Sequence, residues 1–373
     1  MTAASLRKAQ RIVIKIGSQL LVDPETGAVN KAWLATLADD IGMLRAQGKD
    51  VIVVSSGAIA VGRRHLGLPS GDLKLQEQQA AAATGMVRLA HAYQDVLDQH
   101  DLTVSMVLLT LDDSENRRRY INARNTLVEL LRLGAVPLIN ENDTVATDEI
   151  RFGDNDRLAA RVAAMISADL LVVLSDIDGL YSANPQVDAN AVFIPEVHGE
   201  ISDEIERMAG VKLSGDSKGG MVTKLAAAKI AMGAGAKAII ALGTEPHPLK
   251  RILDGARATI FIPNATPRSA RKEWIAGTLS PTGRIVVDAG ALKALKDGNS
   301  LLPAGVRTVE GAFERGDAVS IIDPDGREIA RGLVAYPVSD AIQIAGHKTS
   351  EIEATLGYRG RDEMIHRDDL VLL

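Results

Sequence analysis

The fold is decided by a short apolar stretch near the N-terminus, Arg11-Ile-Val-Ile-Lys-Ile-Gly17. It is rich in β-branched residues and apolar on both faces, which is typical of a strand buried on both sides of a parallel sheet. Five later stretches share this character and predict further strands of the same sheet. They are Val51–Val54, Val104–Leu109, Val136–Ile139, Leu170–Leu174 and Ala238–Leu242.

Amphipathic segments lie between these strands. In Asn30–Gly48, apolar residues recur at helical spacing, Asn30 can cap the start of a helix and Gly48 can end it. Ile121–Gly134 and Met221–Gly235 also have the pattern of helices that end in glycine. This alternation of strands and helices up to about residue 262 predicts an α/β fold, a three-layer αβα sandwich with a mostly parallel central sheet.

The character of the sequence changes after residue 262. Prolines at positions 263, 267 and 281 interrupt a polar stretch that is typical of a linker. Beyond it, short strand-like runs separated by turn dipeptides predict a small, mostly β module. These runs are Arg284–Asp288, Gly305–Val309, Asp317–Ile322, Glu328–Ala335 and Ala341–Ile344. We therefore expect a domain over residues 1–262, a linker over 263–280 and a C-terminal module over 281–373.

The composition excludes several classes of protein. The chain has 373 residues, 46% of them apolar and 24% charged, which excludes a disordered chain. It has no cysteine, so disulfides, thiol catalysis and zinc–thiolate sites are excluded. The longest uncharged stretch, residues 51–62, is shorter than the ~20 residues of a membrane-spanning helix. With no signal peptide evident in the first eleven residues, we expect a cytoplasmic protein without a membrane partner.

Polar residues follow several of the predicted strands, and ligands of open α/β sheets bind at the carboxyl ends of the strands. Lys15 would be buried within the first strand, which requires an anionic partner unless the side chain reaches solvent at the strand end. Ser55 and Ser56 precede Gly57 at an expected helix start. Such a helix start favours an anion, although a plain N-cap serine has the same pattern.

The densest polar stretch joins Asn140-Glu-Asn-Asp-Thr144 to Phe152-Gly-Asp-Asn-Asp-Arg157. Carboxylates and amides that follow a strand can hold an ammonium group, a magnesium-bound phosphate or catalytic lysines. An acidic surface loop is the alternative interpretation.

Two further turns are candidates for nucleotide binding. Ser175 and Asp176 follow a predicted strand, although an ordinary turn has the same pattern. The stretch Lys218-Gly-Gly-Met-Val-Thr-Lys224 opens a helix, where paired glycines and two lysines suit a phosphate. It is not a Walker A loop, and a glycine-rich surface turn is the alternative. The seven histidines show no ligand spacing, which disfavours a histidine-dependent hydrolase.

Separated lysines, glycine-containing turns and an acidic cluster favour phosphoryl transfer, which depends on positioning and on neutralisation of charge. No general base stands out among the residues. An acceptor carboxylate needs none, because its pKa of ~4.3 leaves it ionised at neutral pH.

The sequence resembles the amino-acid-kinase family and, within it, the members that phosphorylate glutamate. The motifs that carry the resemblance are Val13-Ile-Lys-Ile-Gly17, Val54-Ser-Ser-Gly-Ala-Ile-Ala60, Ile139-Asn-Glu-Asn-Asp143, Gly153-Asp-Asn-Asp156, Asp176-Ile-Asp-Gly-Leu-Tyr181 and Gly219-Gly-Met-Val-Thr-Lys224. The C-terminal module resembles a PUA domain. Its matching motifs are Ser300-Leu-Leu-Pro-Ala-Gly305, Ile344-Ala-Gly-His347 and His366-Arg-Asp-Asp369.

The resemblance implies ATP-dependent phosphorylation of the side-chain carboxylate of L-glutamate to L-glutamyl 5-phosphate, the first step of proline biosynthesis. It implies that Lys15 and Lys224 stabilise the transferring phosphoryl group and that Asp156 orients these lysines. The residues implied to hold glutamate are Ser56, Asp143 and Asn155. The implied ATP contacts are Lys15, Ser175, Asp176, Lys218, Gly219, Gly220, Met221, Val222, Thr223 and Lys224. Mg²⁺ would bridge the phosphates of ATP, without a metal site made by the protein itself.

The resemblance also implies feedback inhibition by proline, a homo-oligomer (a dimer or a tetramer) and a hand-off of the product to glutamyl-phosphate reductase. The chain departs from the family at two positions. Ser55 and Lys218 stand where the family often has threonine, which leaves the role of residue 218 open.

Two alternatives stay open. A kinase of the same fold could use another acceptor, such as N-acetylglutamate, aspartate or a nucleoside monophosphate. An RNA-binding regulator is the second alternative, because PUA domains often bind RNA. Residues 281–373 carry 11 basic against 15 acidic residues, a net charge of −4, whereas residues 1–280 carry 31 against 33. An RNA-binding face normally needs a basic surface, so we expect no RNA binding.

Overall fold

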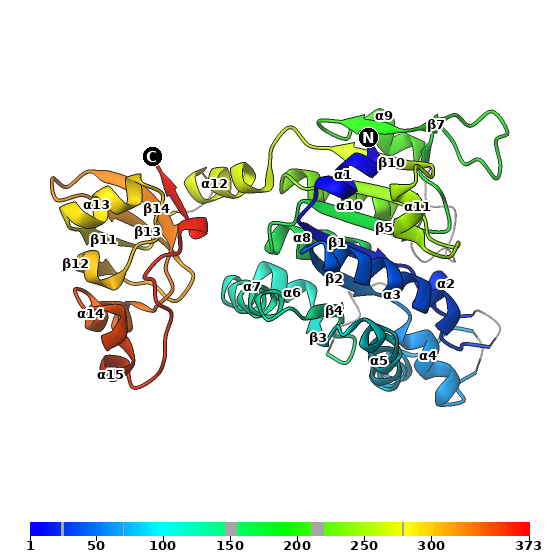
Figure 1. Cartoon of the computed structure of the whole chain (residues 1–373), viewed down its shortest axis with the longest axis horizontal. Coiled ribbons are helices and arrows are strands. Elements are labelled where there is room, and N and C mark those ends of the chain that lie inside the picture. The colour runs from blue at the N-terminus through cyan, green and yellow to red at the C-terminus, as the bar shows by residue number, and fades with distance from the viewer. Residues whose placement is uncertain (24–25, 70, 146–154, 210–219, 278–279) are drawn as a thin grey trace. The chain divides into compact units, whose positions relative to one another are not determined.

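The computed structural model describes residues 1–23, 26–69, 71–145, 155–209, 220–277 and 280–373 (Figure 1). The chain divides into two compact units. The first contains Met1–Glu115 and Asn122–Pro267, and the second contains Asn116–Ile121 and Arg268–Leu373. Helix α12 (Pro267–Gly277) occupies most of the stretch expected to be a linker. The expected boundaries at residues 262 and 281 stay a prediction.

The first unit is built on an eight-stranded sheet with the strand order β3-β4-β2-β1-β5-β9-β10-β8. Neighbouring strands run parallel, except for the antiparallel pair of β9 and β10. The strands are β1 (Arg11–Ile16), β2 (Asp50–Ser55), β3 (Val104–Leu109), β4 (Val136–Glu141), β5 (Leu170–Ser175), β8 (Glu196–His198), β9 (Lys237–Leu242) and β10 (Ala258–Ile262). All six predicted strands and the mostly parallel sheet are thus confirmed.

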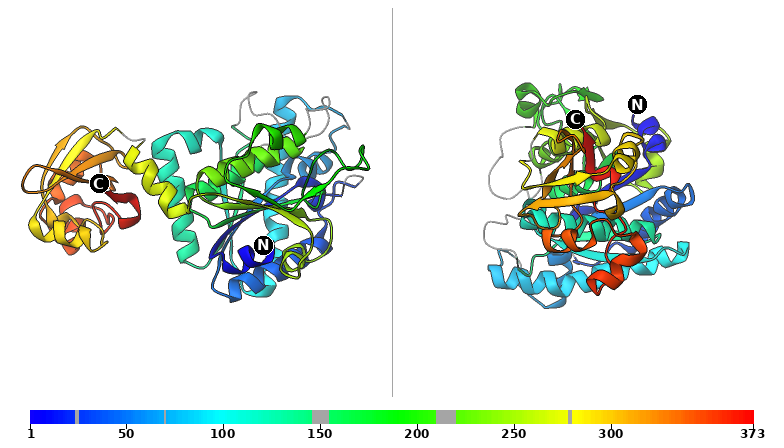
Figure 2. Two further views of the ribbon diagram at one scale, coloured as in Figure 1. Left: turned by 90° about the horizontal axis from the view of Figure 1, so that it is seen from above. Right: turned by 90° about the vertical axis from the view of Figure 1, so that its left-hand side faces the viewer.

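Helices cover both faces of this sheet (Figure 2). One face packs against α3 (Lys31–Ala46), α5 (Leu75–Leu97) and α11 (Pro248–Leu253), and the other packs against α8 (Asn155–Met165) and α10 (Met221–Gly233). The other elements of this part of the chain are α1 (Thr2–Lys8), α2 (Ser18–Leu21), α4 (Ala58–His65), η1 (Asp98–His100), α6 (Leu111–Glu115), α7 (Arg117–Arg132), β6 (Leu180–Tyr181), β7 (Phe193–Ile194) and α9 (Asp203–Met208).

The predicted helix ends are also present. The side chain of Asn30 accepts a hydrogen bond from the backbone N–H of Trp33 and so caps α3. Beyond the end of α10, Gly235 has a φ of 77°, a left-handed conformation that glycine adopts at low cost after a helix.

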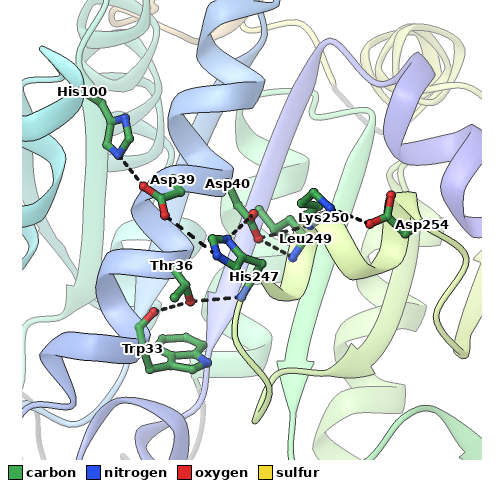
Figure 3. Close-up of polar contacts among 9 residues, drawn as sticks. All are labelled: Trp33, Thr36, Asp39, Asp40, His100, His247, Leu249, Lys250 and Asp254. Carbon is green, nitrogen blue, oxygen red and sulfur yellow. Dashed lines mark hydrogen bonds and ion pairs between the residues drawn. The ribbon is translucent and has the colours of Figure 1, made fainter.

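A polar network ties α3 to α11 and to the loop before it (Figure 3). Asp40 is 2% exposed, and its Oδ2 atom accepts hydrogen bonds from the backbone N–H groups of Leu249 (2.8 Å) and Lys250 (3.1 Å). A side chain of α3 therefore caps the first turn of α11, and burial of this carboxyl group raises its pKa. The Oγ1 atom of Thr36 accepts from the backbone N–H of His247 at 3.0 Å. These bonds fix the loop that follows β9.

The hairpin of α4 and α5 is held by two glycines. A Cβ atom at Gly62 would lie 1.7 Å from the carbonyl oxygen of Ala81, and one at Gly85 would lie 1.7 Å from that of Ala58. The two helix backbones can approach this closely only because both positions lack a side chain. This contact holds α4, which begins directly after the turn that ends β2.

The second unit has its own core and a five-stranded sheet with the order β12-β11-β13-β14-β15. Only β11 and β13 pair in parallel. The strands are β11 (Gly283–Val287), β12 (Val306–Gly311), β13 (Ala318–Ile322), β14 (Glu328–Leu333) and β15 (Leu370–Leu372), and the helices after α12 are α13 (Ala289–Lys296), η2 (Pro303–Gly305), α14 (Val338–Ile344), η3 (Thr349–Glu351), α15 (Ile352–Leu356) and η4 (Arg367–Asp369). The prediction of a small, mostly β module is confirmed.

One of the predicted strands in this unit is wrong. The run Ala341–Ile344 belongs to α14, where Ala341 and Ile344 are both fully buried. Residues three apart lie on the same face of a helix, and so short an apolar run has no clear period of two. Strand β15, in contrast, was not expected.

Candidate active site

The candidate site lies where four central strands end. Strands β4, β2, β1 and β5 are consecutive neighbours in the sheet and run parallel to one another. Because the carboxyl ends of parallel strands meet at the same edge of a sheet, their last residues lie close together. These residues include Lys15, Ser55, Asn140 and Ser175.

Asp156 is fully buried, and it lies at the start of α8 between two buried lysines. The Nζ atom of Lys15 is 2.7 Å from Asp156 Oδ1. Lys224 comes from the first turn of α10 and is within electrostatic reach of both groups. Burial lowers the pKa of Lys224 and the positive charge of Lys15 adds to this effect, whereas the charges of Asp156 and Asp176 oppose it. Two ammonium groups thus lie near the buried Asp156, with the charge of Asp176 also acting on Lys224, and a pair of buried cations suits an anionic ligand.

The second oxygen of Asp156 has a partner of its own. The Oγ1 atom of Thr223 lies 2.7 Å from Asp156 Oδ2, and it also lies 2.8 Å from the carbonyl oxygen of Gly220. Asp156 therefore connects β1, α8 and the first turn of α10. A role for Thr223 towards ATP stays a prediction.

Ser56 and Asn155, both predicted to hold glutamate, are brought together. The Nδ2 atom of Asn155 donates to Ser56 Oγ at 2.9 Å, and it also lies 3.2 Å from the carbonyl oxygen of Ser55 and 3.3 Å from Asn140 Oδ1. Asp143, the third predicted glutamate residue, lies in the turn after β4. Burial raises the pKa of its carboxyl group to about 6.

Asn140 is a functional candidate to which sequence reasoning assigned no role. It is 2% exposed, and its Oδ1 atom accepts from the backbone N–H of Glu141 at 2.9 Å. In the part of the chain that the structure describes, the buried atoms Asn140 Nδ2 and Asn155 Oδ1 have no hydrogen-bond partner. An unsatisfied buried polar group costs about 1–3 kcal/mol, so both amides are candidates for substrate contacts. The signal in the sequence is an amide that directly follows the apolar run Val136–Ile139.

The predicted ATP residues are placed in part. Ser175 Oγ donates to Asp176 Oδ1 at 2.9 Å, and the carbonyl oxygen of Ser175 accepts from the backbone N–H of Gly243 at 2.7 Å. Gly220 is the N-cap of α10, and Met221 and Val222 begin the helix, whose first N–H groups can face a phosphate. Two of the predicted ATP residues, Lys218 and Gly219, lie outside the described residues.

The described residues contain neither a candidate metal site nor a candidate membrane span. No group of three or more histidine, aspartate or glutamate side chains is arranged there to hold a metal ion. Within the same residues, no helix is both long enough and apolar enough to cross a membrane.

Comparison with known proteins identifies both units. The amino acid kinase family matches residues 10–241, and the PUA domain matches residues 283–356. A glutamate 5-kinase of Paramagnetospirillum magneticum is 63% identical over 98% of this chain and 99% of its own length. Glutamate 5-kinases of Rhodospirillum rubrum and Rhizobium rhizogenes are 58% and 59% identical, over 96% and 100% of this chain and 96% and 95% of their own lengths. These matches confirm the resemblance seen in the motifs: the chain belongs to the amino acid kinase family and, within it, to the glutamate 5-kinases.

Proposed function

We propose that the chain transfers the γ-phosphoryl group of ATP to the side-chain carboxylate of L-glutamate, which gives L-glutamyl 5-phosphate and ADP, and that this is the first step of proline biosynthesis. The names of the relatives support the choice of acceptor. The observation that carries the chemistry is the pair of buried lysines around the buried Asp156, at the carboxyl ends of the central strands.

The reaction requires no covalent intermediate with the protein. A carboxylate oxygen of glutamate attacks the γ-phosphorus, and the bond from that phosphorus to the bridging oxygen breaks so that ADP leaves. No proton has to move, because the attacking carboxylate and the departing phosphate are both anions. The main obstacle is the repulsion between these anions, and Lys15 and Lys224 reduce it by placing two ammonium groups near the transferring group.

Asp156 orients the two lysines. Without a carboxylate between them, two buried ammonium groups would repel each other and favour loss of a proton. The ion pair of 2.7 Å holds Lys15 in place, and the charge of Asp156 counteracts the lowered pKa of Lys224. Asp156 is therefore a positioning residue, which favours the charged form of Lys224 and directs both lysines at the phosphate.

The acceptor and the nucleotide occupy different ends of the strand edge in this proposal. Ser56, Asn155 and the amide of Asn140 would hold the polar groups of glutamate, and the carboxylate of Asp143 would pair with its ammonium group. Ser175, Asp176 and the first turn of α10 would contact ATP. The buried cations suit a polyphosphate, and Mg²⁺, when bound to that polyphosphate, would supply further neutralisation of charge.

The test is an assay of the purified protein with Mg-ATP and one acceptor at a time. Hydroxylamine converts an acyl phosphate to a hydroxamate, which is measured by its colour with iron(III). We expect hydroxamate with L-glutamate and none with N-acetylglutamate or aspartate. Formation of nucleoside diphosphate from a nucleoside monophosphate is measured in parallel. Hydroxamate with N-acetylglutamate but not with glutamate would refute the proposed acceptor.

Several expectations from the resemblance remain proposals of the same kind. We expect proline to inhibit the hydroxamate assay and light scattering to give the mass of a dimer or a tetramer. We expect the acyl phosphate to be consumed faster when glutamyl-phosphate reductase is added. A cytoplasmic location is tested by fractionation of cells.

A further inference from the structure

A buried pair of hydroxyl groups lies directly behind the proposed acceptor site. Tyr93 is in α5 and belongs to the main apolar core, where it is 1% exposed. Its hydroxyl lies 3.1 Å from the Oγ atom of Ser55, the fully buried last residue of β2. Burial raises the pKa of the Tyr93 phenol, so this hydroxyl keeps its proton and can donate it in a hydrogen bond.

The hydrogen-bond partners of Ser55 determine which of the two hydroxyl groups donates to the other. Ser55 Oγ lies 3.3 Å from the carbonyl oxygen of Ser56, an atom that can only accept. A serine hydroxyl has one proton, so when Ser55 donates to Ser56 it accepts from Tyr93. The result is a chain of hydrogen bonds from Tyr93 through Ser55 to the backbone of Ser56, in which each bond polarises the next.

This chain ends on the peptide group that joins Ser56 to Gly57. The C=O and N–H bonds of a trans peptide point in opposite directions. Because the Ser56 carbonyl is turned back towards Ser55, the N–H of Gly57 points away from that side. Gly57 has a φ of 99° and is the N-cap of α4, so the orientation of this peptide also sets how α4 begins.

The same turn is fixed from two other directions. The backbone N–H of Ser56 donates to the carbonyl oxygen of Ile16 at 3.2 Å, which ties the turn to β1. Asn155 holds the carbonyl oxygen of Ser55 and the hydroxyl of Ser56. Tyr93 thus contacts the turn from α5, which covers the face of the sheet opposite to α8.

We propose that Tyr93 is a positioning residue for the acceptor: through Ser55 it fixes the peptide between Ser56 and Gly57, so that Ser56 Oγ and the N–H of Gly57 face glutamate. This inference rests on the proposed function. It predicts that loss of the Tyr93 hydroxyl raises KM for glutamate and has little effect on KM for ATP. The reason is that the chain of hydrogen bonds ends at the Ser56 turn and not at the lysines.

The test is a comparison of wild type, Tyr93→Phe and Ser55→Ala by steady-state kinetics in the hydroxamate assay. Each variant removes one hydroxyl of the chain and little volume. We expect KM for glutamate to rise about five- to tenfold in both, the effect of losing one hydrogen bond, while kcat and KM for ATP stay within about twofold. The double variant is expected to be no worse than either single one, since residues that act as one unit are not additive. Ser55→Thr keeps the hydroxyl and should restore the wild-type KM.

A matched control separates positioning from stability. Tyr336, in the second unit, is buried like Tyr93, and its hydroxyl donates to the carbonyl oxygen of Arg361. We expect Tyr336→Phe to lower the melting temperature and to leave KM for glutamate unchanged. A lower melting temperature of Tyr93→Phe with a wild-type KM for glutamate would overturn the inference. If Tyr93→Phe does not fold, a wild-type KM in Ser55→Ala overturns it equally. A wild type that makes no hydroxamate from glutamate would instead refute the proposed function.

Discussion

Thr223 places its hydroxyl 2.7 Å from Asp156 Oδ2, although the two residues are 67 positions apart in the sequence. The bond joins the first turn of α10 to the first turn of α8. Lys224 follows Thr223 directly, so the bond that holds Thr223 also fixes the point from which the side chain of Lys224 extends. One buried carboxylate thereby contacts both Lys15 and the residue next to Lys224.

The first prediction concerns the charge of Asp156. Asp156→Asn keeps the shape of the side chain but removes the anion that pairs with Lys15 at 2.7 Å and that favours the charged form of Lys224, and removal of one partner from a buried ion pair costs about 3–5 kcal/mol. We expect turnover to fall by at least about 100-fold, with a lower melting temperature in the absence of ATP. Steady-state kinetics and thermal unfolding measure the two effects. Thr223→Val, which replaces the hydroxyl with a methyl group, should reduce turnover by less, about tenfold.

The second prediction concerns the lysines. Lys15→Ala and Lys224→Ala should each lower kcat by at least about 100-fold, because removal of a group that stabilises the transition state reduces kcat. KM for glutamate should change by less than about threefold. The control is Lys49→Met: Lys49 is 3% exposed and donates to the carbonyl oxygens of Arg7 (2.7 Å) and Ala9 (2.6 Å), at the opposite edge of the sheet. It should lower stability but not kcat. Wild-type turnover in either active-site variant would remove that lysine from the mechanism.

The third prediction concerns the contact of α4 with α5. A Cβ atom at Gly62 or Gly85 would overlap a backbone carbonyl oxygen, so Gly62→Ala forces the helices apart. Overpacking of this kind costs typically about 1–3 kcal/mol, and because the obstacle is backbone we expect the upper end of that range, measured by urea unfolding. In the control variant Gly233→Ala, at the last residue of α10, the new Cβ meets no atom of another segment within 4 Å. The free energy of unfolding of Gly233→Ala should equal or exceed that of the wild type. An equal loss of this free energy in Gly62→Ala and Gly233→Ala would contradict the explanation.

Most of the fold could be predicted from the sequence because its strands are strongly apolar. Runs such as Ile12–Ile16 and Leu170–Leu174 are almost fully buried, and a chain with that pattern has few other ways to bury them. The wrong strand prediction at Ala341–Ile344 also came from reading a short run with apolar residues as a strand. Four residues with apolar ends fit one turn of a helix as well as a short strand, and only the packing of α14 decides between them.

The residue pattern alone predicted the site most clearly where a buried charge stood out, whereas the prediction for Ser56 and Asn155 came from the family resemblance. Lys15 inside an apolar strand required either an anion or access to solvent at the strand end, and the structure shows the anion, Asp156. Asn140 and Tyr93 gave no comparable signal. An amide at a strand end also suits a turn, and a tyrosine at helical spacing is usually part of the core. Their roles depend on which atoms of Asn155 and Ser55 lie opposite them, and such contacts between distant segments exist only after the chain has folded.

The last prediction is a pH dependence that originates in Asp143. Burial raises the pKa of its carboxyl group to about 6, so this group becomes neutral as the pH falls through that value. The ammonium group of glutamate keeps its charge over the same range and loses its proposed partner. We therefore expect kcat/KM for glutamate to fall below pH 6, about tenfold per pH unit where protonation is complete, while KM for ATP changes little.

Asp143→Asn distinguishes this explanation from a general loss of activity in acid. The variant should bind glutamate weakly at every pH, because its neutral amide resembles the protonated acid, and its pH profile should lack the break near 6. Glutamate should also lower the pKa of Asp143, since a bound ammonium group favours the ionised carboxylate. The break should therefore be shifted to lower pH in kcat, which reports the enzyme–substrate complex, compared with kcat/KM, which reports the free enzyme. A break that persists unchanged in Asp143→Asn would assign the titration to another group and would leave Asp143 without a role in binding the ammonium group.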